Sequence, residues 1–396
     1  MRAITQASLK GKRVLIRVDF NLPLDGELNI TDDSRMVAAL PTIKKVISEG
    51  GRAIILSHLG RPKNRFEDGL SLKHTIKHLS RLLSVQVTFC QDCIGKNTAA
   101  AVNKMTNGDV IVLENLRFYP EEKGGDEAFA RKLASLGDVY INDAFGSAHR
   151  KHASTSIIAK FFPHNKYFGF LLAKEIDSLE KALNKPKRPF TAIIGGAKIT
   201  GKIDVISELF KKVDNLIIGG AMAYTFAKAM GGDVGDSLIE EKKVFLAKKL
   251  IKEAKNRGVN LLLPSDSLNA DRFNAHANTH TSNILSIKTG FMGLDIGPES
   301  IAKFSKTISS SKTLIWNGPM GVFEMKKFER GTKEVGEAIC LATKNGAFSL
   351  VGGGDSVSAA KKFRLAKKVS YVSTGGGAML KYLEGGRLPA IEAIIS

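Results

Sequence analysis

The sequence predicts an α/β fold with two doubly wound, parallel-sheet domains of the Rossmann-like kind, joined by a hinge helix. The chain has 396 residues, a length that suggests two domains or three. Short apolar runs alternate with helical patterns along the chain, which is typical of parallel strands covered by helices on both faces. The residues after these runs change halfway along the chain, from charged side chains to glycines. We therefore expect the two halves to bind different ligands.

In the first half, four apolar runs of strand length each end in polar or charged residues. The runs are residues 14–18, 53–56, 110–113 and 139–141. In parallel sheets, ligands bind at the carboxyl ends of the strands, so the residues that follow each run are the binding candidates. They are Asp19 and Asn21, then His58 and Arg61, then Arg117, and finally Arg150.

Arginines gather at this predicted edge, because Arg35 also stands just before the helical pattern of residues 37–47. The guanidinium group binds carboxylate and phosphate oxygens in pairs, so the set indicates a small ligand with several negative charges. Any single arginine could instead form a surface ion pair. Asp19 and Asn21 could be turn residues before Pro23, and His58 alone would be a packing or capping residue.

Residues 172–185 have the apolar stripe of a helix, with four leucine or isoleucine residues on one face. Pro186 and Pro189 end the pattern. We interpret this helix as the connection between an N-terminal domain, residues 1–171, and a C-terminal domain, residues 186–377.

The second half repeats a different unit, in which an apolar run leads into glycines and then into a helix. Bare backbone at strand ends suits a nucleotide, whose phosphates bind N–H groups and whose base lies against small residues. No cluster is Gly-x-Gly-x-x-Gly with an acidic residue ~20 positions on, so a dinucleotide site is not supported. The glycine stretches are residues 195–196, 219–220, 290–297, 318–321, 352–354 and 375–377.

Residues 191–203 form the most informative of these turns: a buried strand, two glycines and the start of a helix, whose free N–H groups favour an anion. Lys198 and Lys202 are four residues apart and would lie on one face of that helix. The stretch nearly matches a P-loop, but Ile203 stands where Mg²⁺ needs a hydroxyl, so we reject that class. An ordinary tight turn with two solvated lysines is the alternative.

Asp355 directly follows three glycines and could bind the Mg²⁺ that accompanies a nucleotide; a helix N-cap is its alternative role. Other metal patterns are weaker. The pair Cys90 and Cys93 has no second cysteine pair, and the histidine pairs 74/78 and 276/280 lack the glutamate of His-Glu-x-x-His. We interpret them as loop and surface residues.

Composition limits the remaining classes. We expect a cytoplasmic protein, because the N-terminus lacks the apolar run of a signal peptide, no stretch is long enough to span a membrane, and three cysteines make no disulfide framework. The net charge is +20, but the lysines are scattered and no basic run is interleaved with aromatics. Nucleic-acid binding is therefore not expected.

The order of the motifs resembles one family, the phosphoglycerate kinases, along the whole chain. No single motif is specific, but their combination is. The stretches are RVDFNLP at 17–23, SHLGRP at 57–62, ENLRF at 114–118, DAFGSAHR at 143–150, GGAK at 195–198, WNGPMGVFE at 316–324 and GGGDS at 352–356.

The resemblance implies roles for individual positions. It assigns Arg35, Lys198 and Lys202 to catalysis and Asp355 to Mg²⁺, and it implies that the segment from about residue 378 to 396 returns to the N-terminal domain. The implied phosphoglycerate site consists of Asp19, Phe20, Asn21, Arg35, His58, Leu59, Gly60, Arg61, Arg117 and Arg150. The implied nucleotide site consists of Lys198, Lys202, Gly219, Gly220, Gly293, Asn317, Pro319, Val322, Glu324, Gly352, Gly353, Gly354, Asp355 and Ser356.

The implied reaction is a reversible, in-line phosphoryl transfer from 1,3-bisphosphoglycerate to ADP on hinge closure, which gives 3-phosphoglycerate and ATP in glycolysis. The resemblance also implies a monomer. Such a transfer needs positioning and charge neutralisation rather than a nucleophile, and we find no activated Ser, Cys or His constellation. The charge of +20 is more basic than expected for a typical member. A nucleic-acid-binding protein and a nicotinamide dehydrogenase are the alternatives, but neither explains the arginines after the strands.

Overall fold

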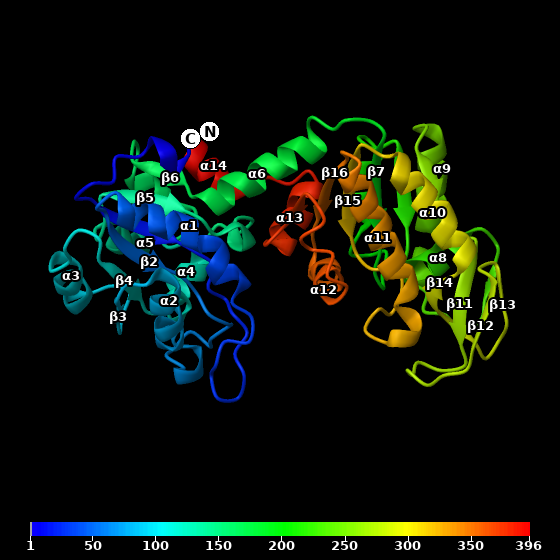
Figure 1. Cartoon of the computed structure of the whole chain (residues 1–396), viewed down its shortest axis with the longest axis horizontal. Helices are drawn as coiled ribbons and strands as arrows, with labels where there is room; N and C mark the ends of the chain where they lie inside the picture. Colours follow the sequence, from blue (N-terminus) through cyan, green and yellow to red (C-terminus); the bar gives the residue numbers. More distant parts are fainter. Residues whose placement is uncertain (1) are drawn as a thin grey trace. The chain divides into compact units, whose positions relative to one another are not determined.

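The computed structural model describes residues 2–396, which divide into two compact units. Unit 1 consists of the chain up to Asp177 together with Arg387–Ser396, and unit 2 is Ser178–Gly386. Each unit has a six-stranded parallel sheet with helices packed around it (Figure 1). Helix α6, Phe170–Leu183, begins in unit 1 and ends in unit 2. The predicted fold class, α/β with two doubly wound parallel sheets, is confirmed.

In unit 1 the strand order is β3-β4-β2-β1-β5-β6. The direction of winding reverses between β1 and β5, which pair directly, so the crevice for a ligand is expected at their carboxyl ends. The four predicted strands are β1, β2, β4 and β5. The elements are β1 Arg13–Arg17, α1 Ser34–Ser48, β2 Arg52–Leu56, α2 Ile76–Leu83, β3 Val87–Cys90, α3 Lys96–Asn103, β4 Val110–Leu113, α4 Pro120–Gly124, α5 Glu127–Ala134, β5 Val139–Asn142, β6 Lys166–Phe168 and α14 Pro389–Ile395.

In unit 2 the main sheet has the order β10-β8-β7-β15-β16-β17, which reverses between β7 and β15. Two small sheets, β12-β11-β14 and β13-β9, accompany it. The elements are β7 Phe190–Ile194, α7 Ile203–Leu209, β8 Asn215–Ile218, α8 Met222–Ala229, β9 Asp233–Val234, α9 Val244–Asn256, β10 Asn260–Leu262, β11 Asp266–Ala270, β12 Thr279–Asn283, β13 Ser286–Ile287, β14 Met292–Ile296, α10 Pro298–Ser310, β15 Thr313–Asn317, α11 Arg330–Lys344, β16 Phe348–Val351, α12 Gly354–Lys362, β17 Tyr371–Val372 and α13 Gly376–Leu383.

Residues 290–297 lie outside the main sheet, because β14 pairs antiparallel with β11, and Gly293 leaves room for the ring of Tyr224. One expectation about unit 2 was wrong. The returning tail is shorter than expected. Residues 378–386 belong to unit 2, where Met379 is buried against Gly352.

The segment that does return to unit 1 is Arg387–Ser396. Its helix α14 packs near β6 (Figure 1). The N–H of Ala390 donates to the carbonyl oxygen of Ala148 at 3.1 Å, and the hydroxyl of Ser156 donates to Pro389 O at 3.3 Å. The chain's last residues therefore fix the loop that carries Arg150.

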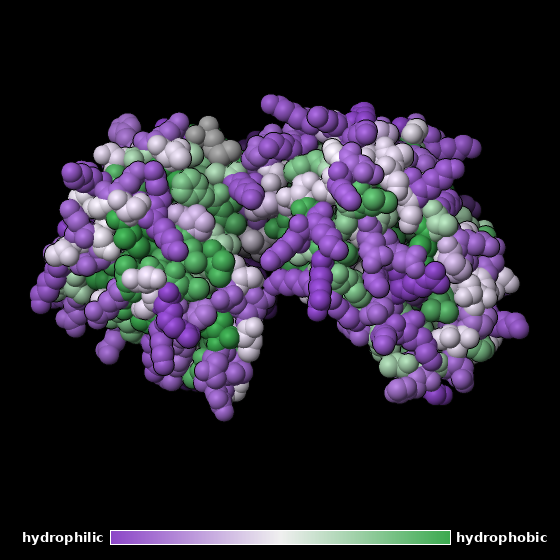
Figure 2. Space-filling view, viewed as in Figure 1, coloured by the Kyte–Doolittle hydropathy of each residue, from purple (hydrophilic) through white to green (hydrophobic). Residues whose placement is uncertain are grey.

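Hydrophilic residues are spread over the visible face of both units, with hydrophobic residues between them (Figure 2). Among residues 2–396, no helix is both long and apolar enough to cross a bilayer.

Candidate active site

At the sheet reversal of unit 1, the loops after β1 and β2 are tied to each other. The N–H of Phe20 donates to Ser57 Oγ at 2.8 Å, and the N–H of Gly60 donates to Asn21 Oδ1 at 2.8 Å. Asp19 Oδ1 accepts from the N–H of Asn21 at 3.1 Å, so Asp19 does form the turn that its sequence position allows. The turn role of Asp19 is compatible with a ligand-binding role, because these hydrogen bonds hold its loop in place at the strand ends.

Arg35 joins this group from the first turn of α1. Its Nη1 donates to the carbonyl oxygen of Asn21 at 2.8 Å and lies 3.5 Å from Asp19 Oδ1. The Arg35 side chain is 38% exposed, so it can reach a ligand in solvent while Asn21 O holds one nitrogen of its guanidinium group. Arg35, Asp19 and Asn21 are thus brought together.

Arg117 lies in the short helix η4, Leu116–Phe118, that follows β4. Its Nη1 donates to the carbonyl oxygen of Gly60 at 2.8 Å. Its Nε is buried without a hydrogen-bond partner among the described residues. Burial, followed by the charges of Arg17 and Arg150, lowers the Arg117 pKa to about 10. A cation is therefore held here at an energetic cost that an anionic ligand would offset.

His58 is buried beside a second buried cation, Arg17. Arg17 Nη2 donates to His58 Nδ1 at 3.1 Å, and its Nε donates to Ser154 Oγ at 2.8 Å. Burial and then the Arg17 charge lower the His58 pKa well below its usual range. Burial and the nearby arginines likewise lower the pKa of His152 to about 3. Both imidazoles are neutral at pH 7 and add no positive charge to the cluster.

Arg17 and His152 were missed as site residues by the sequence analysis. Arg17 is the last residue of an apolar strand and is fully buried. A charged residue within an apolar run was the available signal, because an arginine is rarely fully buried unless it is paired. His152 lies two residues beyond Arg150, in a loop with no predicted structure.

The remaining predicted residues of unit 1 differ in how they can serve. Arg150 is close enough for its charge to lower the pKa of both Arg117 and His58, and its Nε donates to His149 Nε2 at 3.2 Å. Arg61 is exposed. The side chains of Phe20 and Leu59 are buried in the core, so only their backbones can face a ligand.

At the sheet reversal of unit 2, the loops after β7 and β15 are in backbone contact. The N–H of Gly195 donates to Asn317 O at 3.0 Å. A Cβ at Gly195 would lie 2.0 Å from the carbonyl oxygen of Pro319. Gly196 has φ +131°, a region that favours glycine. The close approach of these two loops therefore requires glycine.

Lys202, Asn317 and Gly352 link three strand ends. Lys202 Nζ donates to Asn317 Oδ1, and Asn317 Nδ2 donates to the carbonyl oxygen of Gly352 at 2.8 Å. Burial lowers the Lys202 pKa, while the charges of Asp355 and Glu384 oppose that effect. Asp355 stands exposed in the first turn of α12, whose N-cap is Gly353, so Asp355 is not the helix N-cap that its sequence position allowed. The expected nucleotide-phosphate residues therefore share one region of unit 2.

One part of the prediction for this loop was wrong. Helix α7 begins at Ile203, so Lys198 lies in a loop and the two lysines do not share a helix face. Lys198 is exposed, and its charge lowers the pKa of Glu240, whereas Lys202 contacts Asn317. The Lys198 ammonium group is therefore exposed to solvent near Glu240, whereas the Lys202 ammonium group contacts Asn317.

The expected adenine-site residues lie around the same strand ends. A Cβ at Gly220 would meet the backbone of Gly196 at 2.5 Å, and one at Gly353 would meet the Asn317 amide at 2.7 Å. The N–H of Gly318 donates to Ser356 Oγ. Gly219 and Gly293 are buried against Met320 and Tyr224, Pro319 and Val322 are half-buried, and Glu324 and Gly354 are exposed.

The donor set suits a magnesium ion that arrives with a nucleotide. Among the described residues, no group of three His, Cys, Asp or Glu side chains could hold a metal ion. Mg²⁺ keeps several waters and commonly binds one or two carboxylates together with substrate phosphates. The single exposed carboxylate of Asp355, near Lys202, fits that mode. Of the weaker metal candidates, Cys90 ends β3, and His276 and His280 lie in a turn and in β12 rather than on a helix.

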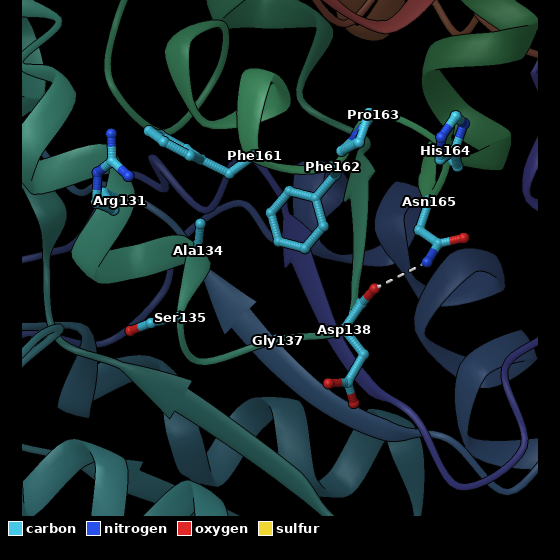
Figure 3. Close-up of a pocket in the computed structure, with 10 residues that line it drawn as sticks. All are labelled: Arg131, Ala134, Ser135, Gly137, Asp138, Phe161, Phe162, Pro163, His164 and Asn165. Atoms are coloured by element: carbon cyan, nitrogen blue, oxygen red, sulfur yellow. Dashed lines mark hydrogen bonds between the residues drawn. The ribbon is translucent and has the colours of Figure 1, made fainter.

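A separate hollow of about 340 Å³ in unit 1 lies outside this site (Figure 3). Its lining residues Asp138 and Asn165 precede β5 and β6, so it is at the amino ends of the strands. Asn165 Nδ2 donates to Asp138 O at 3.4 Å, and the Arg131 guanidinium lies 4.9 Å from the Phe161 ring centroid. These polar groups already have partners within the unit.

The sequence model of the phosphoglycerate kinase family matches residues 4–386. The chain belongs to this family. It is 51% identical to the phosphoglycerate kinase of Porphyromonas gingivalis and 52% identical to that of Chlorobaculum tepidum, with 99% of each chain covered. The structure of phosphoglycerate kinase from Coxiella burnetii is 38% identical, with a TM-score of 0.91 over 99% of this chain and 98% of that chain. The motifs named from the sequence begin at the carboxyl ends of strands in the two main sheets, namely β1, β2, β4, β5, β7, β15 and β16.

Proposed function

We propose that the chain catalyses reversible phosphoryl transfer from 1,3-bisphosphoglycerate to ADP, giving 3-phosphoglycerate and ATP. The observation that carries the proposal is the pair of sites at the two sheet reversals. One presents a cluster of guanidinium groups, and the other presents glycine turns with Lys202 and Asp355. Membership of the phosphoglycerate kinase family supports the same reaction.

The arginine cluster of unit 1 suits phosphoglycerate. After burial, the charges of Arg17 and Arg150 lower the pKa of Arg117, and the charges of all three arginines lower the pKa of His152. The three guanidinium groups therefore form an excess of positive charge. A ligand with a carboxylate and a phosphate would neutralise that excess through bidentate hydrogen bonds. Arg35 and His58 complete the site, with His58 as a neutral hydrogen-bonding group.

The strand ends of unit 2 suit a nucleotide. We assign the phosphates to Lys198, Lys202 and the start of α12. We assign the base to Gly219 and Gly220 after β8, to Gly293 within β14, and to Pro319 and Val322. We assign the ribose contact to Glu324. Asp355 would hold the Mg²⁺, which neutralises phosphate charge when it is bound. The transfer then needs Arg35, Lys198 and Lys202 to neutralise the charge on the moving group and no protein nucleophile.

Because the two ligands would bind different units, transfer requires them to be brought together and water to be excluded. We infer that closure of the units accompanies the reaction, with α6 as the hinge helix. We also propose that unit 1 is the phosphoglycerate-binding domain, that unit 2 is the nucleotide-binding domain, and that the protein is a cytoplasmic monomer.

The direct test is ATP-dependent turnover of 3-phosphoglycerate with Mg²⁺, coupled to glyceraldehyde-3-phosphate dehydrogenase and followed as NADH loss. We expect robust turnover that a chelator abolishes and that added Mg²⁺ restores. Absence of turnover by a folded preparation would refute the proposed reaction. Turnover that persists in the chelator would refute the role of the metal.

A further inference from the structure

We propose that Glu240 is a positioning residue for the phosphate loop, which we define as residues 195–202. The inference rests on the proposed function of that loop in binding nucleotide phosphates. Glu240 is far from the loop in sequence and lies outside all of the motifs discussed above. It immediately precedes the short helix η7, Glu241–Lys243, that leads into α9.

The Glu240 carboxylate binds Thr200 of the loop through both of its oxygens. Glu240 Oε1 accepts the hydroxyl of Thr200 at 2.5 Å, and Oε2 accepts the N–H of Thr200 at 3.1 Å. A side-chain donor and a backbone donor of one loop residue therefore converge on a single side chain.

Glu240 is itself held in place by unit 2. Its N–H donates to Thr225 Oγ1 at 3.1 Å, and Thr225 is buried in α8. Burial alone would raise the Glu240 pKa, but the hydrogen bonds from Thr200 and the Lys198 charge lower it. The side chain is therefore an anion at neutral pH and is fixed to a helix of the core.

The middle of the phosphate loop has few other supports. Ile199 is fully buried and anchors the loop, while Ala197, Lys198, Thr200 and Gly201 are exposed. Among the described residues, no other side chain from outside the loop hydrogen-bonds to residues 197–201. Glu240 is thus the polar anchor between the two lysines.

The contact also changes which groups are available to a phosphate. Consecutive N–H groups commonly form a concave anion site, but the N–H of Thr200 is already used by Glu240. Phosphate binding by this loop then depends on Lys198 and Lys202, which lie on either side of Thr200. By fixing Thr200, Glu240 sets the positions from which both ammonium groups extend.

The test is calorimetric binding of Mg·ADP and of AMP to the full chain, together with KM and kcat for both substrates. We expect Glu240→Gln and Thr200→Val each to raise the Kd for ADP about tenfold, the range for loss of a charge-assisted hydrogen bond. The Kd for AMP, which lacks the β-phosphate, and the KM for 3-phosphoglycerate should change less than twofold.

Two matched variants sharpen the test. Thr200→Ser keeps the hydroxyl and should bind ADP like the wild type. Glu241→Gln removes the neighbouring exposed carboxylate without touching the loop and should also match the wild type. Thr200→Val removes the hydroxyl donor and Glu240→Gln removes the charge of its acceptor. Because both changes weaken one shared contact, the double variant should weaken ADP binding by less than the product of the two single effects.

Wild-type affinity for ADP in both Glu240→Gln and Thr200→Val would overturn the inference, as would equal weakening of ADP and AMP. Thr200 is exposed, so its variants are expected to fold. They therefore still test the inference if Glu240→Gln does not fold. Failure of the wild type to bind ADP would instead refute the proposed function, and the two failures are therefore distinguishable.

Discussion

Gly195→Ala tests whether the contact between the loops after β7 and β15 builds the nucleotide site. The added Cβ would lie 2.0 Å from Pro319 O and 2.8 Å from both Gly318 C and Gly318 O. These are backbone atoms, so no side-chain rotation relieves the overlap. An ordinary contact needs about 3.4 Å or more between carbon atoms, so one loop must move by more than an ångström.

The expected cost follows from that displacement. Overpacking a well-packed region typically costs about 1–3 kcal/mol. Loss of the hydrogen bond from the N–H of Gly195 to Asn317 O adds about 1 kcal/mol. We therefore expect unit 2 to be destabilised by about 2–4 kcal/mol. Because Asn317 also binds Lys202, the affinity for Mg·ADP should fall by at least about tenfold.

Calorimetric titration with Mg·ADP and thermal unfolding would measure both effects. Gly201→Ala is the local control for stability, because a Cβ there meets no atom within 4 Å. Binding of 3-phosphoglycerate reports on unit 1 and should be unchanged. If Gly195→Ala bound ADP as tightly as the wild type, the claim that this backbone contact shapes the site would be wrong.

Three further predictions concern single side chains. Lys202→Ala should lower kcat by about 10² to 10³ with little change in fold, by analogy with the loss of one preorganised donor; a loss below tenfold would remove it from catalysis. Arg117→Met should raise the KM for 3-phosphoglycerate at least about tenfold and leave the KM for ADP unchanged in steady-state assays. Burial raises the Asp143 pKa to about 7 in the folded state. As pH falls, the folded state therefore takes up a proton on Asp143 before the unfolded state does. Burial of the charged carboxylate destabilises the fold above pH 7, and this destabilisation is relieved between pH 7 and pH 4. Denaturant titrations should therefore show that the wild type gains about 1 kcal/mol relative to Asp143→Asn between pH 8 and pH 6, and parallel pH profiles would contradict this.

Much of the fold followed from the sequence because parallel strands buried on both faces leave a strong apolar signal. The runs at 53–56 and 110–113 became β2 and β4 within one residue at each end. Short edge strands leave less signal: β6, Lys166–Phe168, has only three residues and was not predicted. The antiparallel pairing of β14 was also missed. A glycine beside an apolar run has the same sequence pattern whether a helix follows it or whether, like Gly293, it makes room for the ring of Tyr224.

The set of candidate site residues could be named from motifs, but their surroundings could not. Lys198 and Lys202 have helical spacing, yet α7 begins only at Ile203, because the two glycines, the buried Ile199 and the anchor Glu240 hold the intervening chain as a loop. The burial of Arg17 and the neutral state of His58 depend on tertiary packing. No local pattern encodes such features, since they arise from residues far apart in the chain.

The two sheet reversals use the same backbone arrangement for different chemistry. In each unit the chain leaves neighbouring strands in opposite winding directions, which opens a crevice at their carboxyl ends. What differs is the residue type that comes next. After β1, β2, β4 and β5, arginines and neutral histidines leave an excess of positive charge with few acceptors. After β7, β8, β15 and β16, glycines leave bare backbone, and the charged candidate residues are Lys198, Lys202, Glu324 and Asp355. A small, fully charged substrate requires the first arrangement, and a nucleotide with a flat base requires the second. The short segments after the strands therefore decide the ligand, and the sheets decide only where it binds.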